Sequence, residues 1–240
     1  MSQIKNFKEL TSHLSSMKEC PTVAVACPYD EETCEAVSRA LADGLIKAVL
    51  VGEKDKTAAS GLEKRFPGLV TSVDASDSRD AAAKAVALVK AGEASILMKG
   101  LVNTDDLLRA VLNKEDGILP AGTLLTHITV SEIPEMDHLL FFSDVAVIPY
   151  PTLEQRERMI ELDLTIVRKF GVSRPKVALI HFTEKVNPKF PNSVDYQTIV
   201  ERASQGAYGE MVAAGPMDVK TAVDLHSAQV KGIESEVCGN

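Results

Sequence analysis

Residues 98–115, MKGLVNTDDLLRAVLNKE, place a polar turn between an apolar run and an amphipathic helix. The preceding ASILM is typical of a buried parallel strand, so Lys99 leaves the sheet at a carboxyl end, where open α/β sheets bind ligands. Asn103 or Thr104 then caps a helix that carries Arg109. The alternative is an ordinary capped helix with a solvated arginine. The candidate ligand-binding residues here are Lys99, Gly100, Asn103, Thr104 and Arg109.

A second polar segment, HFTEKVNPKFPNSVD at 181–195, follows another strand-like run. It reads as a loop with two prolines, followed by a helix near 195–204. The N-terminus of that helix offers free backbone N–H groups and a serine hydroxyl, which together can receive an anion. A plain N-cap role for the serine is the alternative. The candidate binding residues of this loop are Asn187, Lys189 and Ser193.

One histidine is a further candidate. His127 and Glu132 lie in LTHITVSEIP, and a histidine beside a carboxylate in a cleft can act as a general base. The polar and apolar alternation of the segment fits equally well a histidine that points outward or satisfies a buried acceptor. His127 therefore stays a candidate with two interpretations.

Composition limits the partners. The 240 residues carry a net charge of −8 and are 45% hydrophobic, as is usual for a soluble globular protein. This charge argues against nucleic acid and anionic membranes, so any phosphate-bearing ligand must be met by local basic groups. No apolar run approaches the roughly 20 residues of a membrane span, and residues 1–10 lack a signal core. We expect a cytoplasmic protein.

The four cysteines do not form a disulfide framework. Cys20, Cys27 and Cys34 are evenly spaced but fall on different predicted elements, and Cys238 is remote. We expect each to be a reduced, buried or half-buried thiol. Since no CxxC, HxH or HExxH spacing occurs, we also expect no metal site.

Strand-like runs alternate with helical periodicity up to Gly117, which predicts a doubly wound parallel sheet. Two strand-like runs without a helix between them, 122–134 and 138–151, then predict an antiparallel element in a second lobe. A long helix over 152–172, capped by Thr152, and further strand and helix pairs follow. We therefore expect a two-lobed α/β protein with mostly parallel sheets and helices on both faces. The lobes would be residues 1–118 and 119–240, with a ligand cleft between them. The predicted strands of the first lobe are 22–27, 47–52, 69–73 and 94–100, with helices near 31–43, 53–65 and 79–91.

Several linked segments, spread over residues 20–240, resemble the phosphate acetyl/butyryl transferase family. Two of them, LTHITVSEIP and NPKFPNSVD, are more similar to the butyryl branch than to the acetyl branch. The segments that carry the resemblance are MKGLVNTDDLLRAVLNKE, LTHITVSEIP, FSDVAVIPYPTLEQ, the long helix ending in FGV, RPKVALIHF with NPKFPNSVD, and GPMDVKTAVD.

The resemblance implies a reversible transfer of a short-chain acyl group between coenzyme A, as a substrate rather than a bound cofactor, and inorganic phosphate. It also implies two α/β lobes similar to those of isocitrate and isopropylmalate dehydrogenases, and a homo-oligomer. Arg109 matches a family arginine that helps to hold phosphate. The loop at 187–193 corresponds to one that cradles phosphate in the acetyl branch.

The resemblance further implies that the catalytic residues lie outside this sequence. Family chains continue past the equivalent of Asn240 into a Ser-Arg-x-Asp segment, whose arginine stabilises the transition state and whose aspartate activates the thiol. We therefore expect the 240 residues to be a shortened form of a longer enzyme.

Two other functions remain open. One is a non-catalytic binding or oligomerisation module, left by loss of the C-terminal segment. The other is an NAD-dependent dehydrogenase on the same architecture. Against the second, the sequence has no carboxylate pair with metal-ligand spacing and no GxGxxG.

Overall fold

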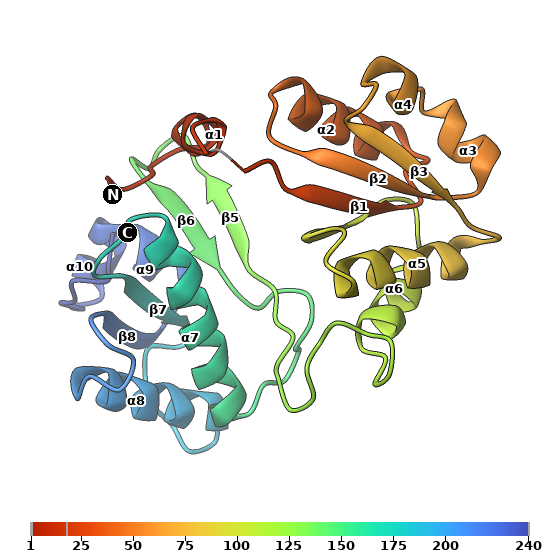
Figure 1. Cartoon of the computed structure of the whole chain (residues 1–240). Coiled ribbons are helices and arrows are strands. Elements are labelled where there is room, and N and C mark those ends of the chain that lie inside the picture. The colour runs from red at the N-terminus through yellow and green to blue at the C-terminus, as the bar shows by residue number, and fades with distance from the viewer. Residues whose placement is uncertain (1, 18, 240) are drawn as a thin grey trace. The chain divides into compact units, whose positions relative to one another are not determined.

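The computed structural model describes residues 2–17 and 19–239. The chain divides into two compact units, residues 11–123 and residues 1–10 together with 124–240 (Figure 1). The sequence predicts a boundary at 118/119 and places residues 1–10 in the first lobe. In the structure, by contrast, residues 2–10 group with the second unit: the Ile4 N–H donates to the Phe170 carbonyl at 2.8 Å.

The unit 11–123 is built on a four-stranded parallel sheet in the order β3-β2-β1-β4. The chain adds strands outward from β1 to β3 and then returns to the other side of β1 with β4. This reversal makes the gap between β1 and β4 the topological switch point of the sheet. The strands are β1 (Thr22–Ala26), β2 (Lys47–Gly52), β3 (Val70–Asp74) and β4 (Ile96–Lys99).

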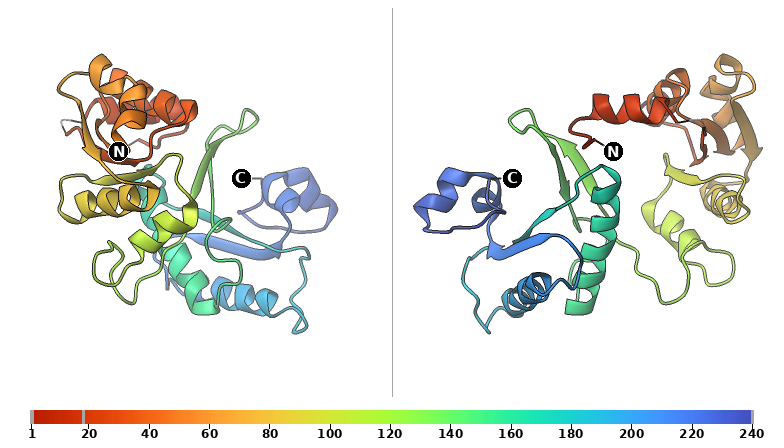
Figure 2. Two further views of the ribbon diagram at one scale, coloured as in Figure 1. Left: turned by 90° about the vertical axis from the view of Figure 1, so that its right-hand side faces the viewer. Right: turned by 60° about the vertical axis from the view of Figure 1, so that its left-hand side comes forward.

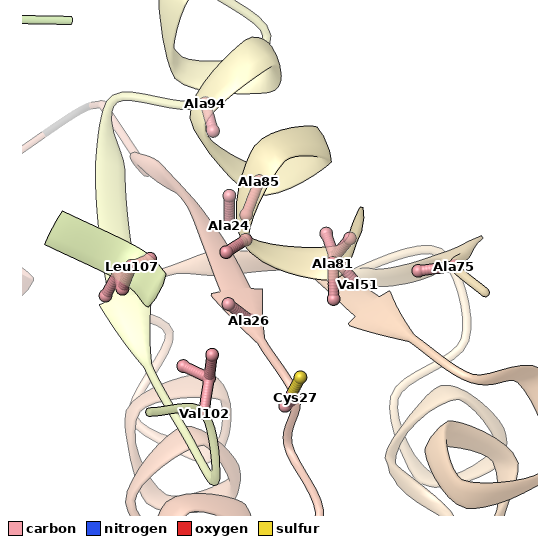
Figure 3. Close-up of a cluster of buried hydrophobic side chains, with 11 residues drawn as sticks. Ala24, Ala26, Cys27, Val51, Ala75, Ala81, Ala85, Ala94, Val102 and Leu107 are labelled. Atoms are coloured by element: carbon pink, nitrogen blue, oxygen red, sulfur yellow. The ribbon is translucent and has the colours of Figure 1, made fainter. Parts of the chain in front are cut away.

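Helices cover both faces of this sheet (Figure 1). Ala24 and Ala26 of β1 face the alanines of α5, whose small side chains let the helix approach the sheet closely (Figure 3). Val23 and Val25 face the opposite side and pack against α2 and α4. Because both faces of β1 are buried, Val23–Ala26 are apolar at every position rather than at every second one. Thr71 and Ser72 of the edge strand β3, by contrast, are exposed. The helices are α2 (Glu31–Ala42), α3 (Lys54–Ala59), α4 (Leu62–Arg65), α5 (Ser78–Lys90) and α6 (Thr104–Val111).

The second unit contains an antiparallel pair, β5 (Thr129–Glu132) with β6 (Leu139–Phe142), and a parallel pair, β7 (Lys176–Ile180) with β8 (Val212–Met217). Side chains alternate along the parallel pair. Val177, Leu179 and Ala213 pack with α7 and α8, whereas Ala178 and Ala214 pack with the C-terminal helices. Figure 2 shows the ribbon of this unit from two further sides. Helix α1 (Phe7–Ser15) precedes the first sheet, and the remaining helices are α7 (Leu153–Lys169), α8 (Pro191–Ser204), α9 (Val219–Val223) and α10 (Leu225–Val230).

The mixed α/β character and the mostly parallel sheets confirm these two parts of the predicted fold class. Two predicted helices are each broken in two. Gly61, with φ of 67°, separates α3 from α4, and Asp224 caps α10 directly after α9. Thr152 caps α7 as predicted, with Gln155 completing a capping box. Among the described residues no helix is long and apolar enough to cross a bilayer.

Residues 2 and 3 lie against the C-terminal end of α7. Gly171 follows this helix with φ of 83°, and a Cβ there would stand 2.8 Å from the Ser2 carbonyl oxygen. Only glycine both adopts this backbone conformation at low cost and leaves room for the N-terminal segment.

Candidate functional site

The backbone at the switch point of the first sheet fixes the predicted turn. The Gly100 N–H donates to the Ala26 carbonyl and the Leu101 N–H to the Cys27 carbonyl, both at 2.8 Å. A Cβ on Gly100 would stand 2.3 Å from the Cys27 oxygen, so the turn requires glycine. Cys27 itself has φ of 55°, uncommon outside glycine. The end of β1 and the turn after β4 therefore form one closely fitted edge.

Charged side chains line this edge. Lys99 is exposed, and its Nζ lies 3.3 Å from the Gly100 carbonyl oxygen. Asp30 caps α2, and hydrogen bonds from the Thr33 hydroxyl and N–H lower the pKa of its carboxyl, with a smaller contribution from the Lys99 charge. Lys99 thus lies within electrostatic reach of the cap after β1. Both strands at the switch point end in a group that can bind or orient a polar ligand.

Of the two residues predicted to cap the helix after the turn, Asn103 and Thr104, the structure selects the first. Asn103 is the N-cap and accepts from the Asp105 N–H at 2.9 Å, so Thr104 is the first helical residue. Arg109 is exposed and five residues further on, about 7.5 Å along the axis. Side chains on a helix lean toward its N-terminus, so Arg109 shares a face with Asp105 and Asp106 of the first turn. Within the described residues Arg109 forms no ion pair, whereas Asp106 is paired with Arg79 at 3.1 Å.

The loop after β7 is closed by its own hydrogen bonds. Ser193 is fully buried; its hydroxyl accepts from the Asn187 N–H at 2.9 Å and lies within bonding distance of the Asn187 and Phe190 carbonyls. Ser193 is neither an N-cap nor a free hydroxyl: α8 begins at Pro191, which has no N–H, and the Ser193 N–H donates to Phe190. Fewer N–H and hydroxyl groups are therefore free to bind an anion at the start of α8 than the sequence predicts. Only Lys189 among the three predicted residues presents an exposed cationic group.

A residue that the sequence interpretation missed holds this loop in place. Arg156 of α7 is 9% exposed and donates to the Asn192 amide oxygen at 2.8 Å and to the Tyr196 hydroxyl at 3.1 Å. Its Nε lies 3.5 Å from the Asp195 carboxylate. Because a buried guanidinium needs several partners, the arrangement fixes the start of α8 onto α7. The signal in the sequence is a charged residue on the apolar stripe of the long helix.

Asp144 organises the segment that contains His127. Its carboxylate accepts from the Thr126 hydroxyl and from the N–H groups of His127, Ala146 and Val147 at 2.8–3.1 Å. Burial alone would raise the pKa of Asp144, but these hydrogen bonds outweigh burial and lower the pKa to about 2. The segment is therefore held around a permanent negative charge.

His127 is not paired with a carboxylate as a base would be. Glu132 accepts instead from the Phe7 N–H at 2.7 Å. The His127 Nδ1 is buried without a hydrogen-bond partner in the described part of the chain. A buried nitrogen without a partner is costly, so this ring atom is the unusual feature of the segment.

The remaining titratable side chains form no metal site in the described part of the chain, and an aspartate among them has a raised pKa. Among the described residues no group of three or more histidines, cysteines or acidic residues is placed to hold a metal ion. The four cysteines form no disulfide among the described residues, and Cys20 is exposed, contrary to the prediction that all four are at least half-buried. In α7, desolvation raises the pKa of Asp163 to about 6, with the Ser143 hydroxyl acting against it and the Asp144 charge with it.

Comparison with known proteins decides the family. The pattern described as phosphate acetyl/butaryl transferase matches residues 68–240. The chain is 37% identical to a phosphate butyryltransferase from Clostridium acetobutylicum, over 98% of this chain and 78% of that protein. It is 36% identical to a phosphate butyryltransferase from Clostridium beijerinckii, with the same two coverages. The chain belongs to the phosphate acetyl/butyryl transferase family.

Solved structures agree with this family assignment. A branched-chain phosphotransacylase from Enterococcus faecalis V583 matches with a TM-score of 0.74 and 25% identity, over 91% of this chain and 76% of that chain. A phosphotransacetylase from Streptococcus pyogenes has the same fold, with a TM-score of 0.75 and 18% identity over 98% of this chain and 80% of that chain. The resemblance found in the sequence segments is thereby confirmed.

Proposed function

We propose that this member of the family transfers a short-chain acyl group of butyryl type reversibly between coenzyme A and inorganic phosphate. The observation that carries the proposal is the match to two phosphate butyryltransferases at 36–37% identity over 98% of the chain. The butyryl branch is preferred because both of these relatives bear that name. The similarity to a branched-chain phosphotransacylase extends the expected substrates to branched acyl groups of similar size.

The reaction sets clear demands on a site. A phosphate oxygen attacks the thioester carbonyl, the carbon–sulfur bond breaks, and the sulfur takes up the proton that phosphate gives up. In the reverse direction the thiol must lose its proton before it attacks the acyl phosphate. Cations and N–H donors stabilise the phosphate and the oxyanion that forms on the carbonyl oxygen.

We assign the phosphate-binding role first to Arg109, whose guanidinium is exposed and without an ion pair among the described residues. Lys99 adds a second cation, Gly100 brings the backbone close to β1, and Asn103 and Thr104 begin the helix that carries Arg109. In the second unit Lys189 supplies charge on a separate loop, for a phosphate of coenzyme A. Asn187 and Ser193 hold the loop rather than contact the ligand.

Further parts of the proposal concern the whole enzyme. The two units follow the architecture of isocitrate and isopropylmalate dehydrogenases, and the protein acts in the cytoplasm as a homo-oligomer. Coenzyme A takes part as a substrate. His127, with its unpartnered Nδ1, is the residue of this chain that we propose as an alternative general base.

The decisive experiment uses the protein expressed from its complete gene. It measures thiol release from acyl-CoA in the presence of phosphate, with butyryl, isobutyryl and acetyl thioesters compared. We expect phosphate-dependent release with the four-carbon thioesters at the highest kcat/KM. Calorimetric titration with coenzyme A accompanies the assay. Binding without phosphate-dependent release would favour a binding module, and reduction of NAD by a hydroxy acid would favour a dehydrogenase.

A further inference from the structure

The end of β7 carries an aromatic surface that the proposed phosphate site does not use. Phe182 is 71% exposed and stacks on His181, with ring centroids 4.3 Å apart and an interplanar angle of 29°. Phe190 meets Phe182 edge-on at 4.8 Å. Phe190 is itself 37% exposed, so the two rings form one apolar surface, and contiguous apolar surfaces of this kind are typical of binding sites.

This aromatic surface is held rigidly from behind. The His181 N–H donates to the Met217 carbonyl at 2.7 Å, and its ring meets Tyr196 edge-on at 6.1 Å. Tyr196 is in turn held by Arg156, and the Phe190 N–H donates to Asn187 at 2.8 Å. The exposed ring of Phe182 thus projects from a fixed loop, so little side-chain entropy remains to be lost when a ligand binds.

The same loop is locally basic on an acidic protein. Lys185 and Lys189 are exposed, and within the described residues neither forms an ion pair. The one acidic residue of the loop, Glu184, is bound by Lys231, which also binds Asp218. The same loop therefore carries two exposed ammonium groups and an exposed aromatic ring.

We propose that this surface binds the adenosine bisphosphate end of coenzyme A, with adenine on Phe182 and the phosphates near Lys185 and Lys189. The proposal rests on the proposed function, which makes coenzyme A the substrate. A purine stacks on an aromatic face and phosphates attract ammonium groups, a combination that an acyl chain does not match. Phe182, Lys185 and Lys189 thereby position the substrate without touching its reacting atoms.

The test compares two thioesters, butyryl-CoA and butyryl-pantetheine, of which the second lacks the nucleotide. We expect Phe182→Ala to lower kcat/KM for butyryl-CoA about 10-fold, as loss of one base stack does, and to leave kcat/KM for butyryl-pantetheine unchanged. Phe182→Trp should retain the wild-type value, and Phe182→Leu should fall between the two. Val230→Ala, which shortens a comparably exposed apolar side chain on α10, is the matched control.

The charges are tested separately. The double variant Lys185→Ala and Lys189→Ala should weaken inhibition by adenosine 3′,5′-bisphosphate several-fold, more at low than at high salt. Lys220→Ala, a single exposed lysine on α9, should not change it.

The outcomes separate this inference from the function. Wild-type protein that releases no thiol from either thioester contradicts the proposed function. If the wild-type protein acts on both thioesters and Phe182→Ala lowers kcat/KM for the two thioesters equally, only the proposal of the adenine site is overturned. A changed sedimentation coefficient for Phe182→Ala, with equal losses on both thioesters, also overturns it and assigns the surface to contact between copies of the chain.

Discussion

Two carboxylates of the second unit have pKa values shifted in opposite directions. The difference lies in how many hydrogen-bond donors each carboxylate has. Asp144 collects one hydroxyl and three backbone N–H groups, which hold its pKa at about 2. Asp163 lies on the buried side of α7, where desolvation raises its pKa to about 6. Asp144 therefore stabilises the fold above about pH 4 and loses that contribution as the pH falls toward 2. Asp163, with its raised pKa, instead makes the fold less stable as the pH rises and the carboxyl ionises.

We predict that Asp163→Asn raises stability at neutral pH. Between about pH 4 and 6 the folded protein still binds the Asp163 proton that the unfolded chain has lost, so stability falls as the pH rises through this window. An amide cannot ionise, and the variant should gain about 1–2 kcal/mol in free energy of unfolding above pH 6.

Urea denaturation at pH 4 and pH 7.5 checks this, and the difference from wild type should nearly vanish at pH 4. Asp116→Asn, at an exposed position, should show no difference at either pH. An equal gain at both pH values would remove ionisation of Asp163 as the cause.

For Arg109 we predict a loss in phosphate affinity. Arg109→Ala removes a charge-assisted contact worth roughly 1.5–3 kcal/mol, which raises the KM for phosphate by about 10- to 100-fold. Arg109→Lys should recover only part of this, because an ammonium group lacks the planar fork of a guanidinium. Steady-state kinetics with phosphate varied at saturating acyl-CoA measure the effect. Arg79→Ala, which removes the neighbouring ion pair with Asp106, is the control, and an unchanged KM in Arg109→Ala would exclude this residue from the site.

At the scale of elements, the switch point depends on close approach of two backbones. A Cβ on Gly100 would lie 2.3 Å from the Cys27 carbonyl, so Gly100→Ala must displace either β1 or the turn that holds Lys99. We predict a loss of about 2–4 kcal/mol in free energy of unfolding, typical of overpacked core positions, and impaired phosphate binding in the remaining folded protein.

Gly44→Ala separates this effect from ordinary backbone strain. Gly44 has φ of 69° but nothing within 4 Å of its would-be Cβ, so alanine there should cost only about 1 kcal/mol. Thermal denaturation of both variants provides the comparison. Equal losses would show that the contact with Cys27 is easily relieved.

The long periodic elements could be predicted from the sequence, because burial imposes a repeating pattern on them. The strands of the first sheet and the helix capped by Thr152 follow this rule. The breaks were not predictable in the same way, since Gly61 and Asp224 each interrupt a pattern that is otherwise continuous. The run 122–134 has the pattern of a single strand, yet only Thr129–Glu132 pairs with another strand.

Within the candidate site, local chemistry could be predicted and long-range contacts could not. The N-cap role of Asn103 depends on its immediate neighbours, so the sequence contains the necessary information. The burial of Ser193 depends on how the loop folds back on Asn187, and the role of Arg156 depends on packing against α8. Such contacts join residues whose proximity no short pattern reports.

At the scale of the whole chain, residues 1–10 tie the two halves of the sequence together. Ile4 is 7% exposed and its N–H donates to Phe170. Residues 113–116 after α6 are exposed and outside any helix or strand, so a specific protease site introduced after Lys114 should be cut readily. We predict that the two fragments then remain together on native gel filtration.

Ile4→Asp supplies the control, because a buried carboxylate without a partner should release the N-terminal segment and allow the cut fragments to separate. Separation of the wild-type fragments would show that the segment contributes little to their association. Co-elution of the Ile4→Asp fragments would point to other contacts as the tie.

The second unit is made of two stretches that are separated in the sequence by the whole first unit, and this arrangement imposes an order on its folding during synthesis. Residues 11–123 form a complete unit of their own, inserted between residues 1–10 and 124–240. On the ribosome this inserted unit can fold as soon as it emerges, since all its strands are already present. The first ten residues must instead wait, unprotected, until Phe170 and Gly171 have been made. Residues 2–10 are thus translated before the inserted unit but reach their native contacts after it, and a chaperone that binds this segment in the meantime would keep it available for α7.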